Sequence, residues 1–286
     1  WQGRTGLSLY HPASEQLAFA SDFPNVTGNS YVTKCIEPCR TQPGIWAACN
    51  NARILHLQHE GMRMQLVKEI SLPAARQIQV LREDQHGNLW IGTENAIYCQ
   101  EVSTDKITKV YSTTAPVKEI VLTPDKHIYC ITEGSELLHI TPNGRMDVIC
   151  KGENYSSAIL APDGRLWVGT LEGKVYSYHP QTGELTQEGS ASNANGDAVK
   201  AMSVDHLGHI WVLTDQYVKE YNPKNQSFRL LYNSDRFIQV DYFLSIHPEA
   251  DGTICLGGIG AFCQVTPSVE LDQSPDHVIP VVSSVK

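Results

Sequence analysis

Short apolar runs separated by turn sequences extend along the whole chain. After each turn comes a second apolar run, often beginning Leu-Trp or Ile-Trp, then a polar hinge, a third run and a weaker fourth. The first runs include IQVLRED, KEIVLTP, SAILAPD, AMSVD and FLSIHP, and the turns that follow them are DQHGN, PDKH, PDGR, DHLGH and EADGT. Asp, Pro and Gly in these turns supply the side-chain hydrogen bonds and backbone angles of tight hairpins. Because no stretch shows helical periodicity over a useful length, the pattern predicts units of four antiparallel strands.

One position of this unit recurs through the chain, usually as tryptophan. It is occupied by Trp1, Trp46, Trp90, Tyr129, Trp167, Trp211 and Cys255, which are 38 to 45 residues apart. That spacing is the length of a propeller blade. Strands that are apolar on both faces must be covered on both sides, and a ring of packed four-stranded sheets achieves this. We expect the Trp to fill the space between neighbouring sheets, and the Gly two residues later to let a neighbour's side chain approach the backbone.

The recurrence predicts an all-β fold, a β-propeller over residues 1–267, most simply with seven blades: six complete repeats and a partial first one. The blades are expected near residues 1–31, 32–70, 71–113, 114–153, 154–191, 192–236 and 237–267. Alternatively, residues 7–20 supply outer strands to the last blade and close a six-bladed ring. Residues 268–286 are predicted to be an exit linker towards a following β domain. Because Trp1 falls in the middle of a repeat, we expect the sequence to be a piece of a longer protein.

The repeat resembles a known family. An apolar strand, the sequence D-x-x-G-x-L-W-I-G-T, a short hinge and a strand ending Y-x-P are similar to the two-component-regulator propeller repeat, closely so at residues 87–93 and 164–170. The units at Tyr129 and Cys255 have lost the Trp. The family forms the sensor regions of hybrid two-component systems, chiefly of Bacteroides. The resemblance implies a periplasmic ligand-sensing domain for oligosaccharides, acting as a dimer, beside a second propeller, an immunoglobulin-like domain, a membrane helix and a histidine kinase.

Composition and charge narrow the classes of partner. The formal charge of -9, from 22 basic and 31 acidic residues, sets up a field that repels phosphate backbones, so we expect no nucleic-acid contact. Eight cysteines are too sparse for a disulfide scaffold. Five of them lie in strand-like runs and are expected to be buried free thiols: Cys49, Cys99, Cys130, Cys255 and Cys263. Cys35 and Cys39 lack the second pair that a zinc site requires.

Candidate binding residues lie on the loops at one end of the predicted ring. There the connections between blades meet the hinges between second and third strands, which carry residues such as Asn51 and Glu94. A sugar site needs a flat aromatic group and a few charged or amide groups. The candidates for this role are Lys118, Tyr155, Lys200, Arg236 and Tyr242. Lys118 and Lys200 begin innermost strands, so they would lie nearest the axis.

The histidines and aspartates of the first hairpins have a structural interpretation. His86, His127, His206, His209 and His247 recur at similar hairpin positions on different blades, which places them far apart around the opposite rim. Recurrence of Asp84, Asp125, Asp163, Asp205 and Asp251 likewise indicates turn capping, and not paired acid and base groups. We therefore predict no metal site, no cofactor and no catalytic residues.

Three functions remain open. The first is a non-catalytic sensor that binds an oligosaccharide or another small ligand. The second is an enzyme of the streptogramin-lyase type, because ITPNGRMDVI and APDGRLWVGT also resemble that propeller, which uses a metal and a histidine near its central channel. No His begins a predicted innermost strand, which disfavours this alternative. The third is a protein-interaction propeller, which predicts a broad exposed apolar patch.

Overall fold

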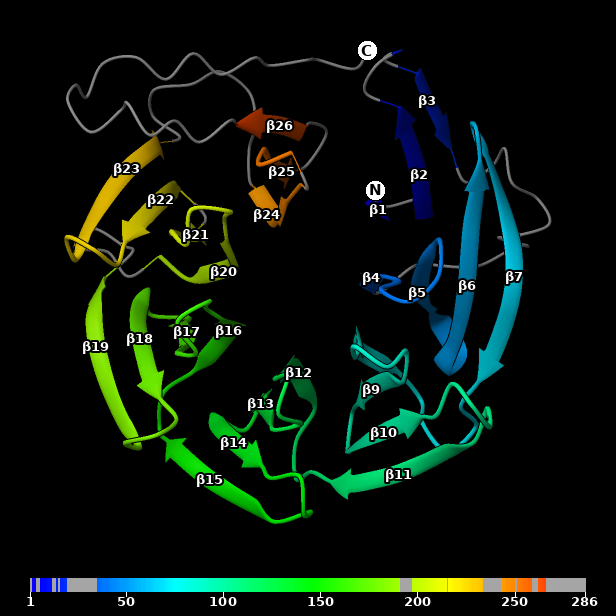
Figure 1. Cartoon of the computed structure of the whole chain (residues 1–286), viewed down its shortest axis with the longest axis horizontal. Helices are drawn as coiled ribbons and strands as arrows, with labels where there is room; N and C mark the ends of the chain where they lie inside the picture. The colour runs from blue at the N-terminus through cyan, green and yellow to red at the C-terminus, as the bar shows by residue number, and fades with distance from the viewer. Residues whose placement is uncertain are drawn as a thin grey trace. The chain divides into compact units, whose positions relative to one another are not determined.

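A computed structural model describes residues 2–3, 6–11, 14, 16–19, 35–190, 197–214, 216–233, 243–249, 251–258 and 262–265 (Figure 1). As predicted, this part of the chain is built from antiparallel β-strands. None of its helical segments has the length or the apolar character needed to cross a bilayer. The chain divides into two compact units, residues 1–151 and 152–286, and each is described by itself.

The first unit contains three four-stranded blades. In each blade the strands follow one another in chain order and pair as an antiparallel meander. The first blade consists of β4 (Cys35–Pro38), β5 (Ile45–Cys49), β6 (Arg53–Glu60) and β7 (Arg63–Ser71); the second of β8 (Ile78–Glu83), β9 (Leu89–Thr93), β10 (Ala96–Gln100) and β11 (Ile107–Ser112); the third of β12 (Val117–Leu122), β13 (Ile128–Thr132), β14 (Glu136–Ile140) and β15 (Met146–Lys151). A short 3₁₀ segment, η3 (Asn50–Ala52), joins β5 to β6.

The second unit repeats the same meander. Its two four-stranded blades and a three-stranded last blade are β16 (Tyr155–Leu160), β17 (Leu166–Thr170), β18 (Lys174–His179) and β19 (Glu184–Ser190); β20 (Val199–Val204), β21 (Ile210–Thr214), β22 (Tyr217–Asn222) and β23 (Ser227–Asn233); and β24 (Phe243–Pro248), β25 (Ile254–Gly258) and β26 (Phe262–Val265). The predicted linker, residues 268–286, lies outside the described residues.

The propeller has six blades, so the prediction of seven is wrong. Six repeats have their own first strand, namely β4, β8, β12, β16, β20 and β24. Among the described residues, the register of Trp1 contributes a three-stranded sheet of the two-residue β1 (Gln2–Gly3), β2 (Gly6–His11) and β3 (Gln16–Phe19), with which no first strand is paired. A recurring sequence position counts second strands, whereas a blade is counted by a sheet that includes its first strand. The partial repeat at the start therefore inflated the count by one.

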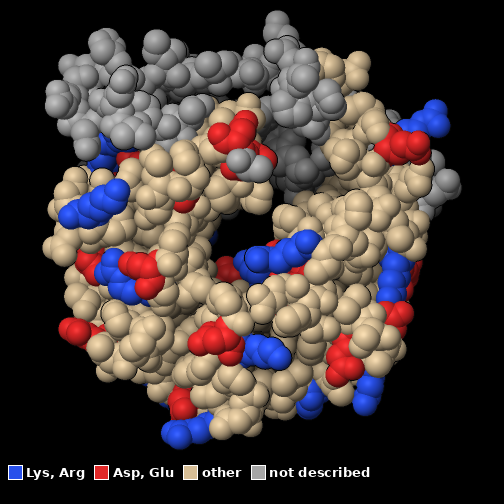
Figure 2. Space-filling view, in the orientation of Figure 1, with Lys and Arg blue, Asp and Glu red and all other residues tan. Residues whose placement is uncertain are grey.

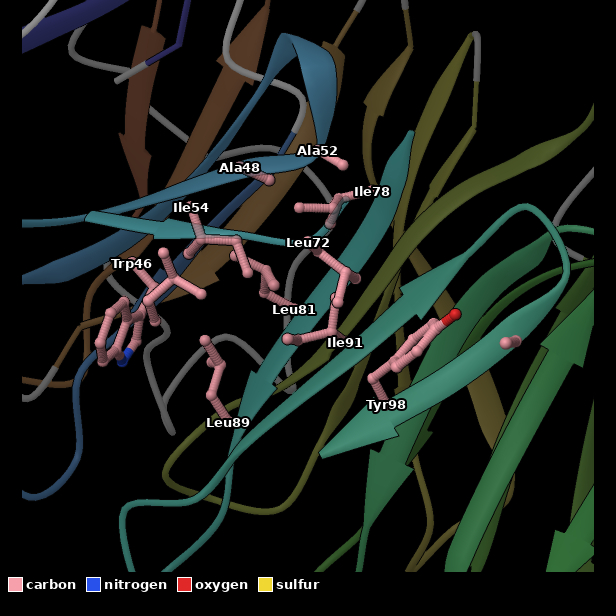
Figure 3. Packing of buried hydrophobic residues seen from close by; sticks show 12 residues of the cluster. Trp46, Ala48, Ala52, Ile54, Leu72, Ile78, Leu81, Leu89, Ile91 and Tyr98 are labelled. Atoms are coloured by element: carbon pink, nitrogen blue, oxygen red, sulfur yellow. The ribbon is translucent and has the colours of Figure 1, made fainter. Parts of the chain in front are cut away.

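The tryptophans and glycines of the repeat pack neighbouring blades together, as predicted. Trp46 lies in a buried cluster with Leu81 and Leu89 of the next blade (Figure 3). At Gly169, a Cβ atom would lie 2.5 Å from Cγ1 of Val199 on the first strand of the following blade. At Gly92 it would lie 2.8 Å from Cγ1 of Val117. The glycine is thus required by the close approach of the adjacent sheet.

An aspartate in the first hairpin connects the turn to the tryptophan of the second strand. Asp205 Oδ1 accepts the backbone N–H groups of Leu207 and His209, and its Oδ2 accepts the indole N–H of Trp211 at 2.9 Å. Asp84 makes the equivalent bonds in its own hairpin, with Trp90 Nε1 at 3.3 Å from its Oδ2. The predicted turn-capping role of these aspartates is confirmed, and it includes orientation of the buried indole.

A β-bulge interrupts the start of every first strand from β8 onward. The pairing shifts between the first and third residues of β8, β12, β16, β20 and β24. The residue that the bulge leaves out of the ladder is Gln79, Lys118, Ser156, Lys200 or Leu244, respectively. Bulges redirect side chains and are frequent beside functional sites. The fold therefore gives each of these blades one position at the strand start that is freed from the regular pairing.

Candidate functional site

A hollow opens at the loop end of the first unit. Asn50 and Asn51 line it from the connection between β5 and β6, and Arg76 and Gln77 line it from the connection between β7 and β8. It is a shallow depression of about 350 Å³ that is wide open to solvent. The hinge of one blade and the connection to the next meet here, as the sequence predicts. We refer to this set of four residues as the loop hollow.

The backbone at the loop hollow is held in an uncommon conformation. Asn51 has φ 62° and ψ 32°, and Ala52 has φ 50°. Asn tolerates this left-handed region, whereas for Ala it costs about 1 kcal/mol. Ala52 is fully buried, and its carbonyl oxygen accepts the backbone N–H of Leu72 at 2.9 Å. Core packing therefore fixes the turn that presents the two asparagine side chains.

Glu94 holds the side of the loop hollow that is formed by Arg76 and Gln77. Its carboxylate accepts the backbone N–H of Arg76 at 2.9 Å and of Gln77 at 3.2 Å. Burial alone would raise the pKa of Glu94, but these backbone donors outweigh it and the pKa is lowered. Glu94 thus remains an anion that positions the two lining residues. Gln79, the bulge residue of β8, donates from Nε2 to Gln77 Oε1 at 3.3 Å and so extends the polar wall towards the strand.

The predicted site residues have different locations. Lys118 is the half-buried bulge residue of β12, which packs beside β8 in the first unit. Lys200 is the corresponding exposed residue of β20 in the second unit. Tyr155 is 0% exposed, so its ring is not accessible for stacking on a sugar. Tyr155 is the first residue of β16, and its side chain points into the core. Its position in the sequence alone did not reveal this burial. Arg236 and Tyr242 lie outside the described residues.

Sequence reasoning did not single out Arg76, Gln77 or Asn50. Arg76 and Gln77 immediately precede an apolar first strand, and Asn50 follows the Trp strand of its blade. The available signal was the Asn-Asn pair at residues 50–51, since consecutive asparagines favour a left-handed turn and carry amides suited to hydrogen bonding.

Charged side chains also join the first strands of three successive blades. Arg82 of β8 donates to Glu37 of β4 at 3.2 Å and to Glu119 of β12 at 2.5 Å. Burial raises the pKa of both carboxyls, although Arg82 opposes this effect. The neighbouring Glu83 accepts the indole N–H of Trp46 at 2.6 Å and the backbone N–H of Thr41 at 3.1 Å. These partners satisfy the buried charges and connect the three blades.

Two of the hairpin histidines have titratable neighbours that the sequence pattern did not indicate. His127 Nδ1 and His139 Nε2 lie 2.7 Å apart, and the two rings stack. His209 Nδ1 lies 2.6 Å from Glu220 Oε1. In each pair the second residue comes from the third strand of the same blade, where strand register, and not sequence proximity, creates the contact.

The chemistry of the loop hollow is hydrogen bonding. Amide and guanidinium groups donate and accept several bonds at fixed angles. Among the described residues of the six first strands, His247 of β24 is the single histidine, and it lies near the end of its strand. On the face shown in Figure 2, acidic and basic side chains lie close to one another instead of gathering by sign. The described residues of the hollow thus form a polar surface in the first unit.

Comparisons with known proteins support the resemblance expected from the sequence. Residues 71–95 match the family model described as two component regulator propeller. This segment includes Arg76, Gln77 and Glu94. No curated protein matches the sequence significantly.

Several solved structures share the fold. The extracellular domain of a hybrid two component system from B. thetaiotaomicron superposes with a TM-score of 0.69 at 16% identity, covering 85% of this chain and 32% of that one. A second such domain from the same organism gives 0.64 at 15% identity, covering 85% and 34%. Virginiamycin B lyase from Staphylococcus aureus gives 0.68 at 14% identity, covering 89% and 85%. The chain spans about a third of the length of the two extracellular domains.

Proposed function

We propose that this chain is a non-catalytic ligand-sensing propeller of a hybrid two component system, exposed outside the cytoplasm in the periplasm. The loop hollow carries the proposal, because its wall at Arg76 and Gln77 lies inside the segment that matches the regulator-propeller family. We propose an oligosaccharide as its ligand. Sugar hydroxyls are both donors and acceptors, and they suit the side-chain amides of Asn50, Asn51 and Gln77.

Arg76 gives this proposal its chemical detail. It is exposed at the hollow, while its backbone N–H is held by Glu94. A guanidinium group binds carboxylates through two parallel hydrogen bonds. We therefore favour an oligosaccharide that carries a uronic acid or another carboxylate over a neutral one. Lys118, in the same unit as the hollow, remains a proposed secondary contact, and Lys200 remains a separate proposed ligand contact within the second unit.

Signalling requires that the ligand bind one arrangement of the domains better than another. The proposed partners are a second propeller and an immunoglobulin-like domain of the same protein, in a homodimer whose geometry is read across the membrane. The chain spans about a third of the extracellular domains that share its fold, which leaves room for such partners.

The experiment is a binding screen with matched variants. The chain, with its neighbouring domains, is titrated by calorimetry with neutral and uronic-acid-containing oligosaccharides. Arg76→Ala and Gln77→Ala are expected to weaken binding of the acidic ligand by at least about tenfold, since each removes one or more hydrogen bonds. Arg63→Ala is the control, because Arg63 is exposed in the β6–β7 hairpin of the same blade and does not line the hollow.

The outcomes separate the remaining functions. Binding that both hollow variants retain would contradict the proposed site. Chemical turnover of an oligosaccharide would favour an enzyme, the alternative suggested by the fold shared with virginiamycin B lyase. A failure of every carbohydrate to bind would instead favour a protein partner.

A further inference from the structure

Three potential metal ligands converge inside the second unit. Asp205 and His209 belong to the hairpin between β20 and β21, and Glu220 lies on β22. One ligand atom of each residue lies within 4.8 Å of the other two. His209 Nδ1 is 2.6 Å from Glu220 Oε1 and 3.5 Å from Asp205 Oδ2. Both carboxylate residues are 4% exposed, so the cluster is shielded from bulk water.

The repeat provides an internal comparison for this cluster. Asp84 in the second blade caps its hairpin and binds its Trp, just as Asp205 does. There Asn88 takes the place of His209, and Cys99 takes the place of Glu220 opposite the Trp. Capping and indole orientation are therefore achieved without an imidazole or a second carboxylate. His209 and Glu220 are therefore additions to the capping arrangement that only this one of the two blades carries.

The three ligand atoms lie close together within a hydrogen-bonded cluster. Glu220 Oε2 is paired with Arg229, which leaves Glu220 Oε1 facing the imidazole. Asp205 Oδ2 accepts the Trp211 N–H and also faces His209. A single imidazole N–H can donate fully to only one of the two carboxylate oxygens. A cation that displaces that proton, with His209 Nδ1 and Glu220 Oε1 moving apart from their present 2.6 Å, would interact with all three atoms at once.

We propose that Asp205, His209 and Glu220 form a binding site for a divalent transition-metal ion of the zinc class. Zinc takes imidazole nitrogen at about 2.0–2.1 Å and carboxylate oxygen at about 2.0–2.2 Å, usually with four ligands. Three protein ligands leave the fourth position for water. Arg229 offsets part of the negative charge of the two carboxylates, so one net negative charge faces the ion. Such an ion would join the β20–β21 hairpin to the third strand of the same blade.

The test is a metal titration of the whole chain after treatment with a chelator. Zinc chloride is added in a calorimeter near neutral pH, and cobalt(II) is added separately to give a visible absorption spectrum that reports ligand type and geometry. We expect one site with His209-dependent affinity and a rise in melting temperature with zinc. His209→Asn introduces the residue found at the equivalent position of the second blade. It should raise the zinc Kd by more than about 100-fold, because losing a metal ligand lowers the affinity more than losing a group that only hydrogen-bonds a ligand.

Two further variants make the result decisive. Glu220→Gln should lower the affinity for zinc to a similar degree. This second variant keeps the proposal testable if His209→Asn fails to fold. His206→Ala changes an exposed histidine of the same hairpin and should leave the affinity unchanged. Absence of zinc binding to the folded wild-type chain would overturn the proposal. So would a site that survives both ligand variants, or one that is lost instead in His139→Asn.

Discussion

Trp167 lies six residues after Ala161, the same separation that joins Trp90 to Asp84 and Trp211 to Asp205. Its indole N–H is fully buried and has no hydrogen-bond partner among the described residues. The backbone of the hairpin is unchanged, since Ala161 N donates to Arg165 O and Gly164 N donates to Ala161 O as in the Asp84 turn. In the second unit, one hairpin thus has the aspartate that caps the turn and binds the indole N–H of its Trp (Asp205 and Trp211), whereas another has alanine in that place (Ala161 and Trp167).

Ala161→Asp should restore the missing acceptor. We expect the free energy of unfolding to rise by about 1 kcal/mol, because a buried donor gains its bond. The backbone N–H and the guanidinium of Arg165 already bond Asp163, so the new carboxylate would share this cation, which lies 5.2 Å from the centroid of the Trp167 ring. Urea denaturation checks the change. The reverse substitution, Asp205→Ala, should cost about 1–3 kcal/mol. Destabilisation by Ala161→Asp would show that burying a second carboxylate near Asp163 costs more than the new bond to Trp167 contributes.

Gly169→Ala should destabilise the second unit by steric overlap. The added Cβ would lie 2.5 Å from Val199 Cγ1 and 3.1 Å from Met202 Sδ, both in the next blade. Overpacking of this kind costs about 1–3 kcal/mol. Val199→Ala alone also destabilises by leaving a cavity, but the double variant should lose less than the sum of the two. Thermal unfolding of the four proteins measures the coupling, and strict additivity would contradict the contact.

Arg82→Met should destabilise the first unit strongly. It leaves Glu37 and Glu119 without their shared cation, and Glu37 is a buried residue at 6% exposure. Breaking a buried pair typically costs about 3–5 kcal/mol. Glu119→Gln should change stability by less than about 1 kcal/mol at neutral pH, since the Glu37 to Arg82 pair remains. Equal losses in the two variants would argue against a shared cation.

The same cluster predicts a pH dependence. The pKa of Glu119 is raised above its usual 4.5 by burial. A raised pKa in the folded state contributes stability that is present below the usual carboxyl pKa and is lost as pH rises through the higher value. Glu119→Gln has no such group, so its stability relative to wild type should increase from about pH 4.5 upward. Urea titrations across this range check the direction, and a constant difference would contradict it.

The buried thiols should resist alkylation. Burial raises the pKa of Cys99 and Cys130 to about 12, and all eight cysteines are free. At pH 8 roughly one such thiol in ten thousand is ionised, and the thiolate is the reactive form. We expect iodoacetamide to leave both residues unlabelled in the native chain and to label them in denaturant, as read by peptide mass spectrometry. Rapid native labelling would show that their blades open readily.

The strand order and core of this protein are predictable from sequence because each blade is encoded locally. The Leu-Trp strand, the following Gly and the capping Asp lie within about ten residues of one another, and hairpin pairing follows from their turns. The number of blades was harder to predict from the sequence. It depends on whether the strands around Gln2 have a first strand of their own, which a recurring motif does not reveal.

The candidate site was predictable only in location. That hinges and blade connections meet at one end follows from the topology, and Asn51 and Glu94 were recognised as loop residues. Whether a residue at the strand start faces the core depends on its place in the bulge: Tyr155 is the first residue of its strand and is buried, whereas Lys200 is the bulge residue of its strand and is exposed. The contact of His209 with Glu220 requires the register of strands two and three, and it has no signature in sequence spacing.

The bulge at the start of the first strands separates what the scaffold must keep from what it is free to vary. Ile78, Val117, Tyr155 and Val199, which begin their strands, are fully buried, while the next residue is Gln in one blade, Ser in another and Lys in two. Gene duplication could therefore copy a blade with its core intact and leave that neighbouring codon to drift. A protein built this way can acquire a new ligand preference through single substitutions that leave its buried core unchanged.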